Sequence, residues 1–288
     1  MKFPNLSSPT LALEQSRRVT FNPVPEVSLI ENTKPRKLFD MAAQLYETFS
    51  GEQVTDDMLV KAAELFNENY GVWGKCSNKA GKPVKLSVRR LRQQYLPPTT
   101  DEARSFYIRV TINGNLVGNA FACRWKCKGS TVCWITQLVV DKDHRDKGLA
   151  SGLLRTLRED FDDIYGVMSS HPAACLAAAR SFAMTIEKIS LDFIRENADS
   201  IMSTSPIPYI RDAELCGTLF NSDDANGIVS GVNTNFFVDH KEPLDALELV
   251  QKLWQWPLGD LPDGYEYLLI MPAKQRRSRS KSADVGRQ

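Results

Sequence analysis

The sequence has no apolar run long enough to cross a membrane and no apolar leader at its start. Its first residues offer only Leu11-Ala12-Leu13 as an apolar stretch, which is too short for the core of a signal peptide. No stretch of about 18 apolar residues follows. An excess of one charge is missing as well, because 36 lysines and arginines face 35 aspartates and glutamates. These absences predict a soluble protein of the cytoplasm or nucleus that neither enters a membrane nor binds nucleic acid through its body.

Several chemical motifs are also missing. The six cysteines show no zinc-type paired spacing, so we interpret all six as reduced thiols and expect no metal ion. There is no dinucleotide-binding glycine fingerprint, no phosphate-loop Gly-Lys-Ser/Thr, no Gly-x-Ser-x-Gly elbow and no His-Glu-x-x-His pair. Nicotinamide, nucleotide, serine-hydrolase and zinc-protease chemistries therefore have no support in the sequence.

The overall composition indicates a globular body, and the two ends of the sequence differ from it in composition. Of the 288 residues, 42% are hydrophobic and 25% are charged, which is typical of a folded soluble protein. Residues 1–34 are rich in proline, and we expect an extended or flexible arm there. Residues 274–288 hold six basic residues and one acid, a net charge of +5 that leaves −4 for the rest. We expect this tail to be a disordered, solvated end; a nuclear address or an arm that touches nucleic acid is the alternative.

Apolar periodicity divides the body of the chain into helices and strands. Repeats of three to four positions predict helices over residues 37–49, 55–70, 86–96, 149–161, 173–184 and 244–254. Alternation or continuous apolar runs predict strands over residues 106–112, 116–125, 131–140, 164–168, 234–238 and 265–270. Asn113-Gly114 is a strong hairpin signal and Gly129-Ser130 a second turn, so the first three strands form an antiparallel meander.

The helix over 149–161 lies between two predicted strands. A strand–helix–strand unit of this length is a crossover, so the strands over 131–140 and 164–168 should be parallel. We therefore expect a mixed α/β fold: a central mixed sheet, made of an antiparallel meander and one parallel crossover, with helices on its faces.

Residues 137–154 form the most informative segment. A buried strand ends at Val140, a tight turn follows, and the next helix opens with four small residues, Gly148, Ala150, Ser151 and Gly152. Small residues let a ligand approach the backbone N–H groups that have no partner within the helix. Together with Arg145 and Lys147, these donors predict an anion site suited to a pyrophosphate.

The pattern Arg145-x-x-Gly148-x-Ala150, set between an apolar strand and an amphipathic helix, resembles the acetyl-CoA signature of the GNAT superfamily of N-acyltransferases. The resemblance implies one GNAT-type domain over 35–273, with the motif-bearing core at 54–184 and a C-terminal portion at 185–273. It implies acetyl-CoA as the acyl donor and an amine as the acceptor. The residues it implies for the donor are Leu138, Val139 and Val140 along the pantetheine arm, and backbone groups of Arg145, Asp146, Lys147, Gly148, Leu149, Ala150 and Ser151 around the pyrophosphate. The region 205–256 resembles fungal members of the superfamily, and this resemblance says nothing about which activity the chain has.

Acyl transfer needs a base for the amine and a proton for the leaving thiolate. Many GNAT members supply the proton from a tyrosine in the helix over 173–184, where this chain has Ala178 instead. Its strand over 131–140 also lacks the glutamate that some members use as base. His171, at the end of a short strand, is the candidate base; its alternative role is to cap the loop before Pro172.

The sequence thus predicts an acetyl-CoA-dependent N-acetyltransferase whose partners are an acyl-CoA and an amine, either a small molecule or a protein. The missing tyrosine and glutamate favour one alternative, an inactive GNAT fold that works as a CoA-binding or protein-interaction module. The basic tail alone suggests another, a nuclear, chromatin-associated protein acetyltransferase. The identity of the amine and the oligomeric state are open.

Overall fold

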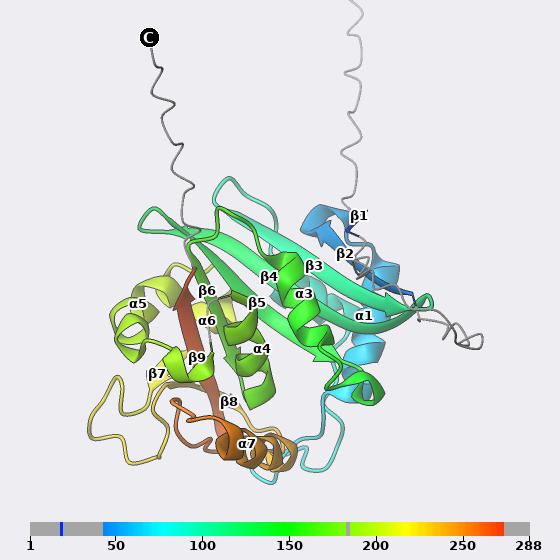
Figure 1. Ribbon diagram of the computed structural model, residues 1–288. Helices are drawn as coiled ribbons and strands as arrows, with labels where there is room; N and C mark the ends of the chain where they lie inside the picture. Colours follow the sequence, from blue (N-terminus) through cyan, green and yellow to red (C-terminus); the bar gives the residue numbers. More distant parts are fainter. Residues whose placement is uncertain (1–17, 20–42, 183–184, 274–288) are drawn as a thin grey trace, which may run out of the picture.

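A nine-stranded sheet forms the centre of the computed structural model, which describes residues 18–19, 43–182 and 185–273 (Figure 1). Its strands are β1 (Arg18–Val19), β2 (Gln44–Ser50), β3 (Ala103–Ile112), β4 (Asn115–Cys127), β5 (Ser130–Val140), β6 (Ile164–Ser169), β7 (Glu214–Cys216), β8 (Gly231–Phe236) and β9 (Gly264–Pro272). They lie side by side in the order β1-β2-β3-β4-β5-β6-β9-β8-β7. Only β5 and β6 are parallel neighbours; the other described pairs are antiparallel. This confirms the expected mixed sheet with one crossover.

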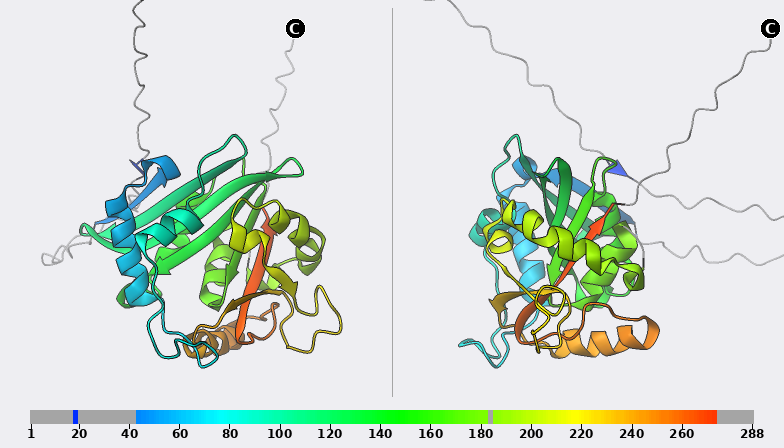
Figure 2. Two further views of the ribbon diagram at one scale, coloured as in Figure 1. Left: turned by 180° about the vertical axis from the view of Figure 1, so that it is seen from behind. Right: turned by 90° about the vertical axis from the view of Figure 1, so that its left-hand side faces the viewer.

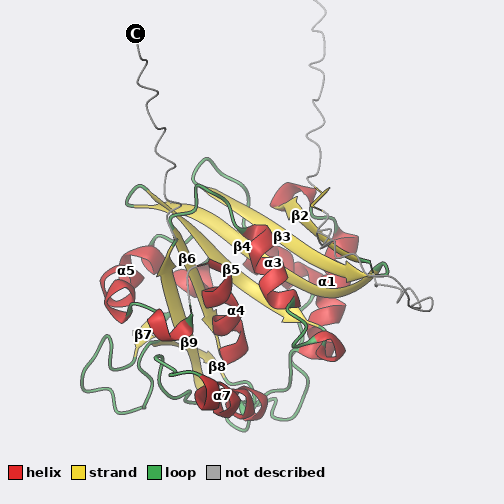
Figure 3. Ribbon diagram, viewed as in Figure 1, coloured by secondary structure: helices red, strands yellow, loops and turns green. Residues whose placement is uncertain are grey.

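Helices cover both faces of the sheet (Figures 2 and 3). They are α1 (Asp56–Asn69), α2 (Val88–Tyr95), α3 (Leu149–Leu157), α4 (Pro172–Phe182), α5 (Leu191–Ser203), α6 (Pro208–Arg211) and α7 (Lys241–Leu253), with short 3-10 turns at Gly51–Gln53, Lys142–His144 and Ile186–Lys188. Alternation along β4 separates the faces: Arg124 bonds the carbonyl of Leu157 in α3, and Trp125 bonds Thr204 after α5. Helices α3 and α4 thus lie on one face, and α1, α2, α5 and α6 on the other. None of the described helices is long and apolar enough to span a membrane.

The meander forms as the turn residues predict. Asn113 and Gly114 both adopt positive φ, at 51° and 82°, which a two-residue hairpin turn of the primed type requires. The next turn falls at Lys128 and Gly129, one residue earlier than expected, with φ of 49° and 86°. All six cysteines are free thiols, as expected.

The helix expected over residues 37–49 is wrong. Residues 44–50 form strand β2, which pairs with β3 from Gln44↔Ile112 to Ser50↔Phe106, while residues 37–42 lie outside the described part. The segment contains many helix-forming residues, but seven backbone pairs along the edge of β3 outweigh that weak preference. The pairing also places Tyr46 against α3, where it matters for the site described below.

Helix α3 is shorter than the expected 149–161. It ends at Leu157, whose carbonyl accepts from the Arg124 guanidinium, and the Asp162 carboxylate then accepts from the Glu159 N–H at 2.9 Å. These bonds draw the chain out of the helix. Phe161, expected on the apolar face, is 59% exposed instead.

The ends of the chain were harder to predict. The expected arm at 1–34 lies outside the described residues apart from Arg18–Val19, which pair with β2, and the expected tail at 274–288 lies outside them entirely. The expected elements at 234–238, 244–254 and 265–270 correspond to β8, α7 and β9 with shifted bounds. Helices α5 and α6 and strand β7 had not been expected.

Candidate active site

The entrance of helix α3 is open. Gly148 caps the helix with φ of +77°, and a Cβ built on it meets no heavy atom within 4 Å. The first bond inside the helix runs from the Gly152 N–H to the Gly148 carbonyl at 2.9 Å. The N–H groups of Leu149, Ala150 and Ser151 therefore have no carbonyl one turn earlier, and the positive end of the helix dipole lies beside them. This is the geometry of an anion site.

The charged side chains of the motif brace its loop. Arg145 donates from Nη2 to the carbonyl of Asn69 at 2.7 Å, from Nε to the carbonyl of Val140 at 3.4 Å, and from Nη1 to the carboxylate of Glu242 in α7. Lys147 donates to the carbonyl of Asp143 at 2.9 Å. The backbone N–H groups of the helix entrance, more than these two cations, would therefore bond an anion there.

Beside this entrance, strands β5 and β6 part. Their parallel pairing runs from Val132↔Ile164 to Ile135↔Val167 and ends, although β5 continues to Val140 and β6 to Ser169. Thr136 forms a bulge at this level, because Phe121 of β4 pairs with Gln137 and the next residue pairs with Ile135. Leu138, Val139 and Val140 pair with β4 on one side only, so their other backbone edge faces the gap.

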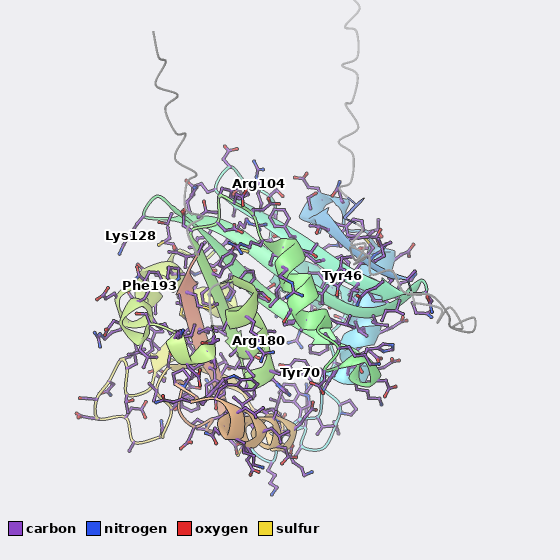
Figure 4. The ribbon with its side chains drawn as sticks, viewed as in Figure 1. Tyr46, Tyr70, Arg104, Lys128, Arg180 and Phe193 are labelled. Carbon is purple, nitrogen blue, oxygen red and sulfur yellow. The ribbon has the colours of Figure 1, made fainter. Side chains whose placement is uncertain are left out.

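The run of small residues has a second cause besides ligand access. A Cβ on Gly152 would lie 2.2 Å from the hydroxyl oxygen of Tyr46, whose side chain lies against α3 (Figure 4). The Ser151 carbonyl accepts from the hydroxyl of Ser181 in α4 at 3.3 Å. Gly152 thus serves the packing of α3 on β2, and Gly148 is the glycine that opens the entrance.

His171 lies in the loop that starts α4. Its Nδ1 accepts from the Ala173 N–H at 3.2 Å, and its Nε2 lies 3.5 Å from Oε1 of Glu242. The bond to His171, followed by the charge of Arg145, lowers the pKa of the Glu242 carboxyl. His171 therefore occupies the capping position that was its alternative reading. Its role as a base stays a prediction.

Four titratable residues that sequence reasoning missed lie on the opposite face of the sheet from α3. We call them the tyrosine–glutamate cluster: Tyr70 after α1, Tyr95 at the end of α2, Tyr209 in α6 and Glu266 in β9. The ring centroids of Tyr95 and Tyr209 are 5.7 Å apart, and the hydroxyl of Tyr209 donates to the Thr136 carbonyl at 3.0 Å. The Tyr70 hydroxyl bonds the side chain of Ser170, just beyond β6. Figure 4 shows Tyr70 at the end of the molecule where α7 lies, remote from Lys128.

Glu266 has the most unusual environment of the four. Desolvation raises its pKa to about 7, and a hydrogen bond with Thr234 opposes this only in part. Its negative charge adds to the burial that raises the pKa of Tyr95 to about 12 and that of Tyr70 and Tyr209 well above 10. All four residues are of intermediate exposure. A partly exposed carboxyl group whose pKa lies near neutrality is suited to accept a proton.

One sequence signal could have found Glu266. It is the single charged residue in the otherwise apolar and aromatic run of 265–271. The tyrosines carry no comparable signal, because they come from three separate segments of the chain that only the fold brings together.

Residues 62–184 match the family model of the acetyltransferase (GNAT) family. Among similar solved structures is the ribosomal-protein-S18-alanine N-acetyltransferase of Escherichia coli, with 16% identity over 47% of this chain and 75% of that chain and a TM-score of 0.32. Another is a GNAT-family acetyltransferase of Streptococcus pneumoniae, with 14% identity over 47% and 82% and a TM-score of 0.33. These low scores add no argument to the family match. A search of curated proteins found no match.

Proposed function

We propose that the chain, whose residues 62–184 match the model of the GNAT acetyltransferase family, transfers the acetyl group of acetyl-CoA to an amine. One observation supports this most directly: strands β5 and β6 part beside the open entrance of α3. A pyrophosphate needs unpaired donors, and an extended pantetheine arm needs a free strand edge; both lie next to each other here. The single nine-stranded sheet, with β1 and β7 at its edges, supports treating residues 35–273 as one catalytic domain.

The donor site would use mainly backbone atoms. N–H groups of Gly148 to Ser151 suit the pyrophosphate, and the free edge of Leu138 to Val140 suits the amides of pantetheine. When bound, the coenzyme would supply an activated acetyl group as its thioester. At the bulge of Thr136 the loss of pairing between β5 and β6 leaves backbone groups that could bond an oxyanion.

A second candidate is a GNAT fold that binds the coenzyme without catalysis. It is favoured by Ala178, which stands in α4 where many members have a tyrosine. A nuclear role has only the basic tail at 274–288 in its favour, outside the described residues.

Calorimetric titration with acetyl-CoA tests the donor site. Gly148→Arg should weaken binding more than 100-fold, because its side chain fills the space in front of the helix entrance. Gly129→Arg is a matched control: Gly129 has φ of +86°, also has open space at its Cβ, and lies at the opposite end of β5. Equal affinity of the two variants would place the coenzyme elsewhere.

Turnover over a panel of amines then separates the enzyme from the binding module. Mass spectrometry should detect an acetylated amine that forms at a rate dependent on acetyl-CoA. Binding of acetyl-CoA without product from any amine would favour the module instead.

A further inference from the structure

We propose that Glu266 and the three tyrosines around it bind the acceptor, and that this acceptor is a primary amine with one positive charge and no carboxylate beside its amino group. The inference rests on the proposed acetyltransferase function, because it assigns the second substrate of the same reaction.

The first support is position along the sheet. Ile135 of β5, Val167 of β6 and Leu269 of β9 share the last row in which β5 and β6 pair. β9 runs antiparallel to β6, so Glu266 lies three residues beyond that row, about 10 Å toward the open end. By the alternation of β9, its side chain lies on the face opposite Tyr267, whose pKa responds to Cys175 of α4. Glu266 therefore lies at the gap but on the face away from α3 and α4.

The second support is charge. Two other carboxylates in or next to this sheet have a cation: Asp162, before β6, bonds Arg124 at 2.7 Å, and Glu47 of β2 bonds Arg109 at 2.8 Å. The titratable groups that act on Glu266 or respond to it are Tyr70, Tyr95 and Tyr209 on its face and Cys175 in α4. In the described part of the chain no lysine, arginine or histidine offsets its charge. A bound ammonium group would supply the missing partner.

The third support is a set of buried polar atoms without partners in β5 at the level where β5 and β6 part. The amide of Gln137 makes no hydrogen bond within the described structure, although the residue is only 7% exposed, and neither does the hydroxyl of Thr136. Gln137 pairs with Phe121, whose ring centroid lies 6.1 Å from that of Tyr95. A buried amide without hydrogen bonds destabilises the fold, and a ligand that bonded it would remove this cost.

The surroundings favour an ammonium group over other ligands. Faces of aromatic rings attract cations, and three tyrosines lie near enough to Glu266 for its charge to raise their pKa. A carboxylate next to the amino group, as in a free amino acid, would be repelled by Glu266 in surroundings where no cation compensates. The site therefore selects a simple amine against an α-amino acid.

The chemical step follows from this arrangement. The Glu266 carboxylate takes one proton from the ammonium group, which frees the lone pair of the nitrogen. The nitrogen attacks the thioester carbonyl, the new C–N bond forms, and the C–S bond breaks. The thiolate of the coenzyme takes up the second proton that the nitrogen loses, and Glu266 returns its proton to solvent.

The test uses the full chain with 2-phenylethylamine and phenylalanine as matched probes, which differ by one carboxylate. Titration of the CoA-saturated protein at pH 8 should show the amine binding at least 10-fold more tightly than the amino acid. Glu266→Gln, which keeps the shape and the Thr234 bond, should weaken amine binding at least 10-fold while acetyl-CoA binding stays within twofold of wild type. Glu214→Gln, an exposed carboxylate on β7, is the control and should change neither.

Turnover adds a second readout. In the wild type, kcat/KM should rise as the pH passes about 7, because the carboxylate becomes available as a base. Glu266→Gln should lower kcat/KM about 100-fold or more and lose this limb of the profile. Equal binding of the two probes, or amine binding that Glu266→Gln leaves unchanged, would overturn the acceptor site. Amine binding without turnover would instead refute the acetyltransferase function and leave the site standing.

Discussion

The two ends of the parallel β5–β6 pair differ in how far a buried carboxylate is compensated by partners within the protein. At the closed end, Asp162 accepts from Arg124 at 2.7 and 3.0 Å, from the Glu159 N–H at 2.9 Å and from the Tyr165 hydroxyl at 3.1 Å. At the open end, Glu266 has one bond, with Thr234, and the amide of Gln137 has none within the described residues.

This difference separates charge that holds the fold from charge that is available to a ligand. A buried ion pair whose bonds are all made inside the protein has nothing left to offer a substrate. A carboxyl group that burial leaves partly protonated, beside an unbonded amide, retains that capacity. The comparison can be tested by removing a group at each end.

The largest effect is expected at the closed end. Asp162→Ala leaves the Arg124 guanidinium buried without its counter-ion, so we expect a loss of about 3–5 kcal/mol in the free energy of unfolding. Urea denaturation measures it. Asp245→Ala, which breaks the exposed contact with Lys241 at 3.8 Å, should cost less than about 1 kcal/mol. Similar losses in the two variants would mean that the closed end is not held by its ion pair.

The next effect is a pH dependence at the open end. The pKa of Glu266 is about 7 in the folded chain against an ordinary 4.5, so the folded state holds the proton more tightly. The contribution of Glu266 to stability is therefore fully present below pH 4.5 and is lost as the pH rises to 7. Above pH 7, Glu266→Gln should melt a few degrees higher than wild type, and this difference in melting temperature should disappear toward pH 4.5. A difference in melting temperature that does not vary with pH would contradict the raised pKa.

The smallest effect is expected for Gln137→Leu. Its amide already lacks partners, so a leucine of similar volume should change the free energy of unfolding by no more than about 1 kcal/mol in either direction. Urea denaturation beside Asp162→Ala gives the contrast directly. A loss of 3 kcal/mol or more would show that this amide supports the fold and is not free for a ligand.

The parts of the fold that sequence predicted are those with local signals. Asn113-Gly114 defines the first hairpin, and the spacing of residues 137–164 defines the crossover, because each pattern lies within one continuous segment of the chain. Strand β2 was missed because its conformation depends on pairing with β3, about sixty residues away. The helix-forming residues of that segment gave the opposite indication.

The same distinction applies to the candidate site. The donor half lies in one continuous segment, 138–151, where turn, glycine and strand stand next to one another. The acceptor half draws on Tyr70, Tyr95, Tyr209 and Glu266, and its chemistry arises from burial that no single segment encodes. A pKa of about 7 is a property of the folded surroundings, so composition and spacing could not predict it.

Glu242 links the two sides of the gap between β5 and β6. Its carboxylate contacts Arg145, which follows β5, and lies 3.5 Å from His171, which follows β6. One side chain of α7 thus contacts residues on both sides of the gap, where backbone hydrogen bonds no longer join β5 and β6. Because the pKa of Glu242 is lowered, its carboxylate stays charged at neutral pH. The side chain that links the two sides of the gap thus lies outside residues 62–184, the part of the chain that matches the GNAT family model.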